Sequence, residues 1–207
     1  FDWKIPKEWN VNDAYILDKK NNKIIDFKKN NLHLMGYSRS ITKVLKKTDL
    51  LKKIYSIKKK PNAIPYRTSY YNLDWGFCCT NKVLNKIKNN YDQNDKFKVY
   101  IDSKFNKNGK MHFGEYLIKG KSKKEILIST YICHPSMANN ELSGPIVSMA
   151  LINFFKKKYN KKTIRFVFIP ETIGSIAYIY HNRNKLKKNV FGGYVLSCIG
   201  DEKRYSC

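Results

Sequence analysis

The sequence predicts an α/β fold in which a partial parallel sheet occupies the C-terminal half and a β-rich region precedes it. Three apolar runs, at residues 126–132, 163–169 and 193–199, lack the alternation of a half-exposed strand, which is typical of parallel strands buried on both faces. Helical segments at 145–157 and 174–187 separate the three runs. The expected order is therefore βαβαβ, with right-handed connections.

Shorter elements are predicted before this sheet. Apolar patches around Trp9 and Ile25 flank the polar stretch 18–22, which predicts a hairpin at the start of the chain. The spacing of apolar residues over 39–56 predicts a helix, with Thr48-Asp49 as the N-cap of its second half.

Further along, Thr80 is expected to cap a short helix that runs through Ile87. Residues 97–102 alternate apolar and polar side chains, as a half-buried strand does. Residues 106–110 have the composition of a tight turn, so we expect 111–118 to return as the hairpin partner of that strand.

The change of pattern near residue 119 suggests two regions. We expect residues 1–118 to form a β-rich insertion or lid with short helices, and 119–207 to form a partial α/β core. The chain has 207 residues, of which 42% are apolar, so a sizeable core is expected. Because it begins at Phe1 and ends soon after the third parallel strand, we expect an internal fragment of a longer protein.

Cysteine usage and hydropathy bear on the compartment. The chain has 5 cysteines, an odd number, and they show no disulfide or Cys-x-x-Cys zinc spacing. No apolar run reaches the length of a membrane span, and no signal peptide is visible. We therefore expect reduced thiols, a cytoplasmic location and no membrane partner.

The net charge of +25 raises the question of nucleic-acid binding. Only five of the 41 basic residues are arginine, the side chain that phosphates and bases favour, and the lysines are spread along the chain. We interpret the charge as solvated surface and expect no nucleic-acid partner.

Polar side chains follow the strands of the predicted sheet. His134 comes after the first strand and Glu171 after the second, so both should emerge at the carboxyl edge, where α/β sheets bind ligands. Zinc takes imidazole and carboxylate ligands, and a further carboxylate can act as a general base toward water. This assigns His134 as a metal ligand, Asn140 or Glu141 as a second ligand, and Glu171 as the base.

Structural interpretations of the same residues stay open. A histidine at a sheet edge is often only hydrogen-bonded. Glu141 and Glu171 could each cap the helix that follows, and Asn139-Asn140 could form a simple turn.

The stretch 129–145 (STYICHPSMANNELSGP), together with 168–175 (FIPETIGS), resembles the bacterial aminopeptidase-like family, whose members are called domains of unknown function and are sometimes tied to polysaccharide biosynthesis. The opening 1–9 and the segment around Tyr70 and Trp75 resemble the family as well. The family is similar to zinc aminopeptidases of the bacterial leucyl aminopeptidase and transferrin-receptor type. The resemblance implies a phosphorylase/hydrolase-like zinc-peptidase sheet, with His134 as first metal ligand and Glu171 as general base.

The sequence departs from the zinc aminopeptidase pattern at three positions. Asn140 stands where the resemblance places a metal-bridging Asp, Thr172 where it places a ligand Glu, and Ser197 where it places a third-strand Asp. We therefore expect one zinc ion rather than two, or else a degenerate site.

Two functions remain in view. The first is metal-dependent hydrolysis of a peptide or amide bond in a small-molecule substrate. The alternative is a non-catalytic binding module for a peptide or glycan precursor. Aromatic residues Tyr70, Tyr71 and Trp75 are candidates for substrate contact, although packing in a small β-rich core is the preferred explanation of this aromatic segment.

Overall fold

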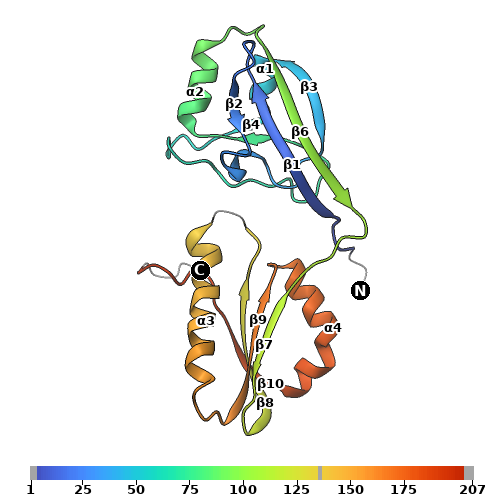
Figure 1. Cartoon of the computed structure of the whole chain (residues 1–207), viewed down its shortest axis with the longest axis vertical. Helices are drawn as coiled ribbons and strands as arrows, with labels where there is room; N and C mark the ends of the chain where they lie inside the picture. The colour runs from blue at the N-terminus through green and yellow to red at the C-terminus, as the bar shows by residue number, and fades with distance from the viewer. Residues whose placement is uncertain (1–3, 135–136, 203–207) are drawn as a thin grey trace. The chain divides into compact units, whose positions relative to one another are not determined.

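A computed structural model describes residues 4–134 and 137–202 (Figure 1). The chain divides into two compact units, Phe1–Gly109 and Lys110–Cys207, which are described separately below. The C-terminal unit begins at Lys110 rather than at 119, because strand β7 (Gly114–Ile118) belongs to its sheet.

The N-terminal unit is mainly β-structure with two α-helices. Its elements are β1 (Glu8–Leu17), β2 (Lys23–Asp26), the 3-10 turn η1 (Asn31–His33), β3 (Ile41–Lys46), α1 (Lys47–Leu51), β4 (Ile54–Tyr55), β5 (Phe77–Cys78), α2 (Asn81–Asn90) and β6 (Lys96–Asn106). Strands β2-β1-β6-β3 form an antiparallel sheet in that order, and β4 pairs with β5 in a small parallel ladder.

The predicted N-terminal hairpin is confirmed. Strands β1 and β2 are antiparallel neighbours, and the carboxylate of Asp18 organises their turn by accepting hydrogen bonds from the backbone N–H groups of Lys20 and Asn22. Asn21 adopts the left-handed conformation (φ 62°) that this turn requires. The inner face of the sheet packs with α1 and α2 around fully buried side chains such as Ile16, Phe77 and Phe97.

The long helix predicted over 39–56 is wrong. The apolar residues that suggested helical spacing belong to three consecutive elements, β3, α1 and β4. Strand β3 pairs with β6 along its whole length, from Ile41 opposite Ile101 to Lys46 opposite Lys96. This pairing outweighs the local preference, and the N-cap of the short helix α1 is Lys46 rather than Thr48-Asp49.

The short helix after Thr80 is confirmed. Helix α2 begins at Asn81, and the Thr80 hydroxyl accepts a hydrogen bond from the backbone N–H of Val83. At the other end of the helix, the buried ammonium of Lys47 donates to the carbonyl oxygens of Lys88 (2.9 Å) and Tyr91. Both ends of α2 are thus fixed by side chains from the residues around it.

The C-terminal unit has the βαβαβ order that the apolar runs predict. Its elements are β7, β8 (Ser122–Tyr131), the π-turn η2 (Ala138–Leu142), α3 (Ser143–Phe155), β9 (Lys162–Ile169), α4 (Ile173–Asn189) and β10 (Val190–Val195). The sheet order is β10-β8-β9-β7, in which β10, β8 and β9 are parallel and β7 is antiparallel to β9.

The hairpin predicted between 97–102 and 111–118 is wrong. Strand β6 is bordered by β1 on one side and β3 on the other, so it has no free edge for β7. Strand β7 pairs instead with β9, where Glu115 contacts Arg165. The turn composition of 106–110 marks a connection between the two units rather than a hairpin.

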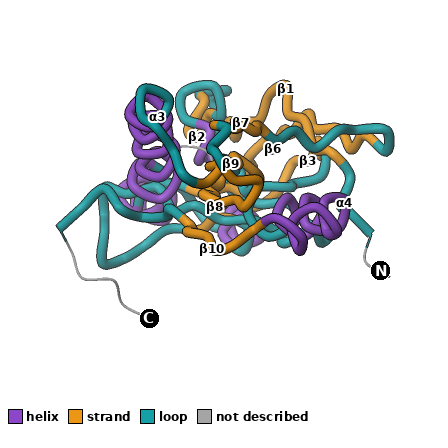
Figure 2. Tube along the Cα trace, turned by 90° about the horizontal axis from the view of Figure 1, so that it is seen from below, coloured by secondary structure: helices purple, strands orange, loops and turns teal. Residues whose placement is uncertain are grey.

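Helices α3 and α4 lie on opposite faces of the parallel strands (Figures 1 and 2). One face is covered by α3, where Leu151 and Phe155 pack on Ile164 and Phe166. The other is covered by α4, where Tyr178 packs with Val167. Because the connections after β8 and β9 lead to opposite faces, the strand ends between them form the position where open α/β sheets bind ligands.

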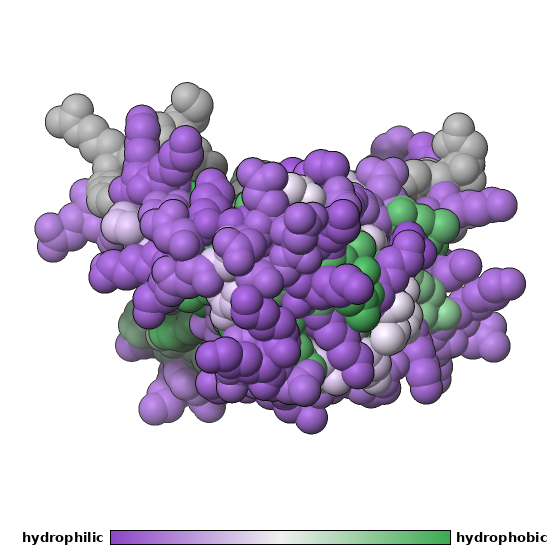
Figure 3. All heavy atoms as spheres, turned by 90° about the horizontal axis from the view of Figure 1, so that it is seen from above, coloured by the Kyte–Doolittle hydropathy of each residue, from purple (hydrophilic) through white to green (hydrophobic). Residues whose placement is uncertain are grey.

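Among the described residues, no helix combines the length and apolarity needed to cross a bilayer. Hydrophilic side chains cover most of the face drawn in Figure 3, as the lysine-rich composition predicts.

Candidate functional site

The central contact of the site joins the loops that follow β8 and β9. The Nε2 atom of His134 lies 2.9 Å from Oε2 of Glu171, so the predicted convergence of these two side chains is confirmed. The side chain of His134 is 25% exposed and that of Glu171 is 48% exposed, so water reaches both. Their catalytic roles stay predictions.

Glu171 does not cap the helix that follows it. The N-cap of α4 is Thr172, which makes no side-chain capping hydrogen bond. Thr172 has φ 56°, a conformation that is unfavourable for a β-branched residue and concentrates at functional sites. The turn after β9 therefore presents Glu171 to His134 at a cost in backbone strain.

Glu141 is the buried carboxylate of the site, with 7% of its surface exposed. Its Oε2 atom accepts a 2.6 Å hydrogen bond from the backbone N–H of Cys133, so it binds the end of β8 rather than capping α3. Its Oε1 atom lies 3.8 Å from the Cys133 sulfur, which can donate a weak hydrogen bond to it. Each carboxylate oxygen retains a lone pair for a cation.

Cys133 is a site residue that sequence reasoning missed. Its sulfur, a nitrogen of His134 and a carboxylate oxygen of Glu141 all lie within 4.8 Å of one another. Burial is the main reason that the pKa of this thiol rises to about 11, and the nearby Glu141 and Glu171 add to the rise. The available signal was its position, directly before His134 at a strand end, together with the affinity of zinc for sulfur.

Asn140 faces the residues that follow the third parallel strand, β10. Its Nδ2 atom donates to the Tyr131 hydroxyl (3.0 Å) and lies 3.5 Å from the sulfur of Cys198. The Tyr131 hydroxyl is also 2.5 Å from Oγ of Ser197. The Oδ1 atom of Asn140 is buried, and no described residue donates to it. Such an unsatisfied acceptor needs an explanation, and a bound cation is one.

The end of β10 is tied to the same edge. Asn139 accepts a 2.7 Å hydrogen bond from the Gly200 backbone N–H and donates to Asp201, while the Ser143 hydroxyl accepts from the Ile199 N–H. The Asn139-Asn140 pair is therefore more than a turn, because it fixes the loop after β10 against the loop after β8.

This donor set fits a single divalent cation such as zinc. Imidazole nitrogen, cysteine sulfur and carboxylate oxygen are its usual protein ligands, and the described residues bring one of each together. The unsatisfied Asn140 oxygen adds a fourth acceptor in the same loop.

The predicted substrate-contacting aromatic residues all lie in the N-terminal unit. Trp75 is 7% exposed and packs in the core of that unit, which favours a structural role. Tyr70 and Tyr71 are 79% and 49% exposed. Their contact with a substrate stays a prediction.

The fold is similar to the folds of a putative peptidase and of a zinc aminopeptidase. It matches the crystal structure of a "putative peptidase" from Clostridium acetobutylicum with a TM-score of 0.89 and 42% identity, over 98% of this chain and 46% of that one. It also matches a zinc aminopeptidase from Bacillus subtilis with a TM-score of 0.62 over 96% of this chain and 58% of that one; at 14% identity this likeness concerns the fold alone.

The chain belongs to the family described as Domain of unknown function (DUF4910), which matches residues 1–207. It is 43% identical, over 203 residues, to a Clostridium acetobutylicum protein named "Putative polysaccharide biosynthesis protein with aminopeptidase-like domain". The family resemblance expected from the motifs is confirmed. The match covers 97% of this chain but 45% of that relative, so the chain spans less than half the length of the relative.

Proposed function

We propose that this chain contributes the central part of the active site of a metal-dependent hydrolase of the aminopeptidase type, which cleaves a peptide or amide bond. The observation that carries the proposal is the 2.9 Å contact between His134 and Glu171, beside the cluster of Cys133, His134 and Glu141. The peptidase-like fold and the aminopeptidase-like relative support the same reaction class.

In this proposal His134 and Glu141 hold one zinc ion, with Cys133 and the Asn140 carbonyl oxygen as further ligands. A cation in this place supplies Lewis-acid polarisation and lowers the pKa of water. Thr172 and Ser197 offer hydroxyl groups where zinc aminopeptidases place carboxylates, which favours one ion over two.

Glu171 is the proposed general base. Its carboxylate is accessible to water, and the hydrogen bond to His134 fixes one of its oxygens. The other oxygen can take a proton from the attacking water and return it to the leaving amine.

The decisive experiment compares Glu171→Gln with Glu202→Gln in the natural protein that carries this chain. The Gln side chain at 171 keeps the shape but cannot take a proton, so we expect release of N-terminal residues from peptides to fall by about 10² or more while zinc stays bound. Glu202 is an exposed carboxylate after β10 and serves as the matched control.

Each outcome separates the two candidate functions. Chelator-sensitive peptide hydrolysis with stoichiometric zinc supports the hydrolase. Folded protein that binds no zinc and releases no residue favours the alternative, a binding module that keeps the peptidase fold. Full turnover in Glu171→Gln would show that another group is the base.

A further inference from the structure

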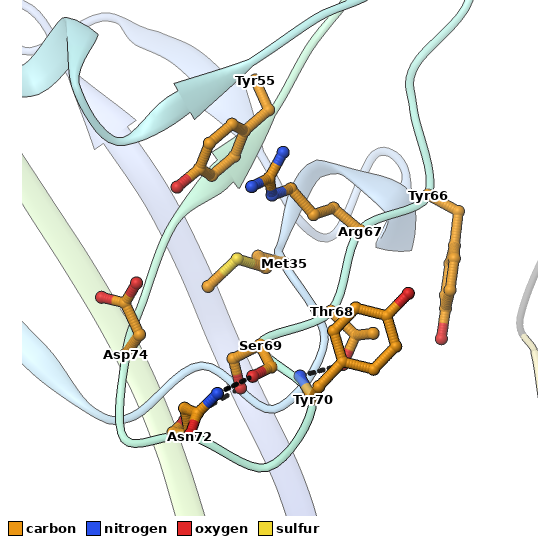
Figure 4. Close-up of a pocket in the computed structure, with 9 residues that line it drawn as sticks. All are labelled: Met35, Tyr55, Tyr66, Arg67, Thr68, Ser69, Tyr70, Asn72 and Asp74. Carbon is orange, nitrogen blue, oxygen red and sulfur yellow. Dashed lines mark hydrogen bonds between the residues drawn. The ribbon is translucent and has the colours of Figure 1, made fainter.

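The N-terminal unit has a cavity of its own, of about 510 Å³. We call it the Arg67 cavity, and its walls include Tyr55, Tyr66, Arg67, Tyr70 and Asp74 (Figure 4). A second hollow of about 610 Å³ adjoins it and shares Tyr55, Tyr66 and Arg67. Both volumes are in the range of small-molecule sites. No residue of the Arg67 cavity belongs to the candidate site of the C-terminal unit.

Arg67 is the charged group that the two hollows share. Its guanidinium carbon lies 3.8 Å from the centre of the Tyr55 ring, so one face of the guanidinium is covered by an aromatic plane. Within the described part of the chain, no carboxylate accepts a hydrogen bond from it. Arg165, in contrast, is paired with two glutamates. A stacked guanidinium with its N–H fork unpaired suits bidentate recognition of a carboxylate or phosphate.

The other walls of the cavity offer aromatic rings and a carboxylate that can accept a hydrogen bond from a hydroxyl group of a ligand. Tyr66 is 37% and Tyr70 is 79% exposed, and Figure 4 shows both on the opposite side of the cavity from Asp74. The Asp74 carboxylate receives a 2.6 Å hydrogen bond from Lys53, which neutralises its charge while leaving lone pairs for a hydroxyl group. Aromatic faces with a nearby carboxylate suit the apolar face and the hydroxyl groups of a sugar ring.

The loop that carries Tyr70 is held in an unfavourable conformation. Tyr70 and Tyr71 have φ values of 49° and 70°, in the left-handed region that tyrosine rarely adopts. Ser69 and Asn72 hold the turn, because the Ser69 hydroxyl donates to the Asn72 carbonyl and the Asn72 side-chain amide donates to the Ser69 carbonyl (Figure 4). The backbone of this turn is therefore held by its own hydrogen bonds, which lowers the entropic cost of ordering it when a ligand binds.

We propose that the Arg67 cavity binds a sugar unit that carries a negatively charged group, either a carboxylate or a phosphate. The charged group pairs with the Arg67 fork, the ring packs on Tyr66 or Tyr70, and a hydroxyl group donates to Asp74. This inference rests on the N-terminal unit alone, so it stands or falls separately from the proposed hydrolysis.

The experiment is an NMR titration of the chain with D-glucuronate, D-glucose 1-phosphate, D-glucose and inorganic phosphate. The Arg67 Nε–H resonance is assigned by its loss in Arg67→Gln. We expect at least one anionic sugar to shift it and to bind about tenfold tighter than glucose or inorganic phosphate. Arg67→Gln should weaken that binding about tenfold, and Arg67→Lys should recover only part of it.

Lys43→Gln is the matched control, because it removes one positive charge from an exposed position of β3 outside the cavity. We expect it to change the affinity less than twofold, which separates local contact from the overall charge of the chain. Equal binding of glucose, equal binding of inorganic phosphate, unchanged affinity in Arg67→Gln, or no shift with any of the four probes would each overturn the proposal.

Discussion

Replacing Arg165 with methionine should destabilise the C-terminal unit more than an ordinary core substitution. Arg165 has no exposed surface, and its guanidinium donates to both oxygens of Glu125, at 2.6 and 2.9 Å, and to Glu115. The side chain of Glu125 is 6% exposed, so Arg165→Met leaves a buried carboxylate without its cation. Breaking a buried pair in this way costs about 3–5 kcal/mol. The loss of the contact with Glu115 adds less to this destabilisation, because the Glu115 side chain is 29% exposed to water and accepts a hydrogen bond from the Tyr178 hydroxyl.

The assay is urea unfolding followed by circular dichroism at 222 nm, which chiefly reports α3 and α4, the two longest helices. A loss of 4 kcal/mol lowers the urea midpoint by about 2 M when the slope is about 2 kcal/mol per M. The double variant Arg165→Met with Glu125→Met replaces the buried pair by apolar side chains and should recover most of the loss. A loss below about 1 kcal/mol in the single variant, or no recovery in the double one, would refute this reasoning.

Two further predictions concern the N-terminal unit. Lys47→Met keeps the aliphatic stem but removes the two hydrogen bonds that the buried ammonium donates at the end of α2. Urea unfolding should show that the free energy of unfolding falls by about 1.5–3 kcal/mol. The control is Lys86→Met, at an exposed position of the same helix, which should lower it by less than about 0.5 kcal/mol. For Asp18, burial acts to raise the pKa, but hydrogen bonds from Asn22, Tyr91 and Lys20 outweigh it, so the pKa is lowered from 3.8. The contribution of Asp18 to stability is therefore present above about pH 4 and is lost as the pH falls through the folded-state pKa. The free energy of unfolding of Asp18→Asn should therefore depend less on pH, between about pH 5 and pH 2, than that of the unaltered chain. An equal pH dependence of the unfolding free energy in the two proteins would contradict this.

The parallel part of the fold was largely predictable because its strands are apolar runs, and β9 is buried along most of its length. The third run was placed too late in the chain: β10 spans Val190–Val195 rather than 193–199, and it is mostly exposed because it lies at the edge of the sheet. Strands β8 and β9 and helices α3 and α4 lie where the pattern places them. The N-terminal unit was harder, because its pairings are non-local. Strand β3 was mistaken for a helix since Val44, 62% exposed, and Leu45 fit helical spacing, whereas the partner that decides their structure is β6, more than 50 residues away. Likewise, β7 pairs with β9 beyond β8 rather than with the preceding strand.

The site was predictable to the extent that strand ends meet at one sheet edge. This rule brought His134 and Glu171 together although 37 positions separate them in the chain. It did not reveal Cys133, because the orientation of a side chain just beyond a strand depends on the loop that follows. The Glu141 carboxylate that holds this loop lies eight residues later in the chain. Nor did it indicate that Asn139 and Asn140 would contact the residues after β10.

The proposed function depends on a cation held between the ends of β8 and β9, within reach of the water-accessible carboxylate of Glu171. Anomalous X-ray diffraction at the zinc edge, on crystals of the zinc-loaded natural protein, tests this most directly. We predict one peak in contact with the side chains of His134 and Glu141, with Glu171 facing it. A peak elsewhere, or protein saturated with zinc and no peak at His134, would contradict the account.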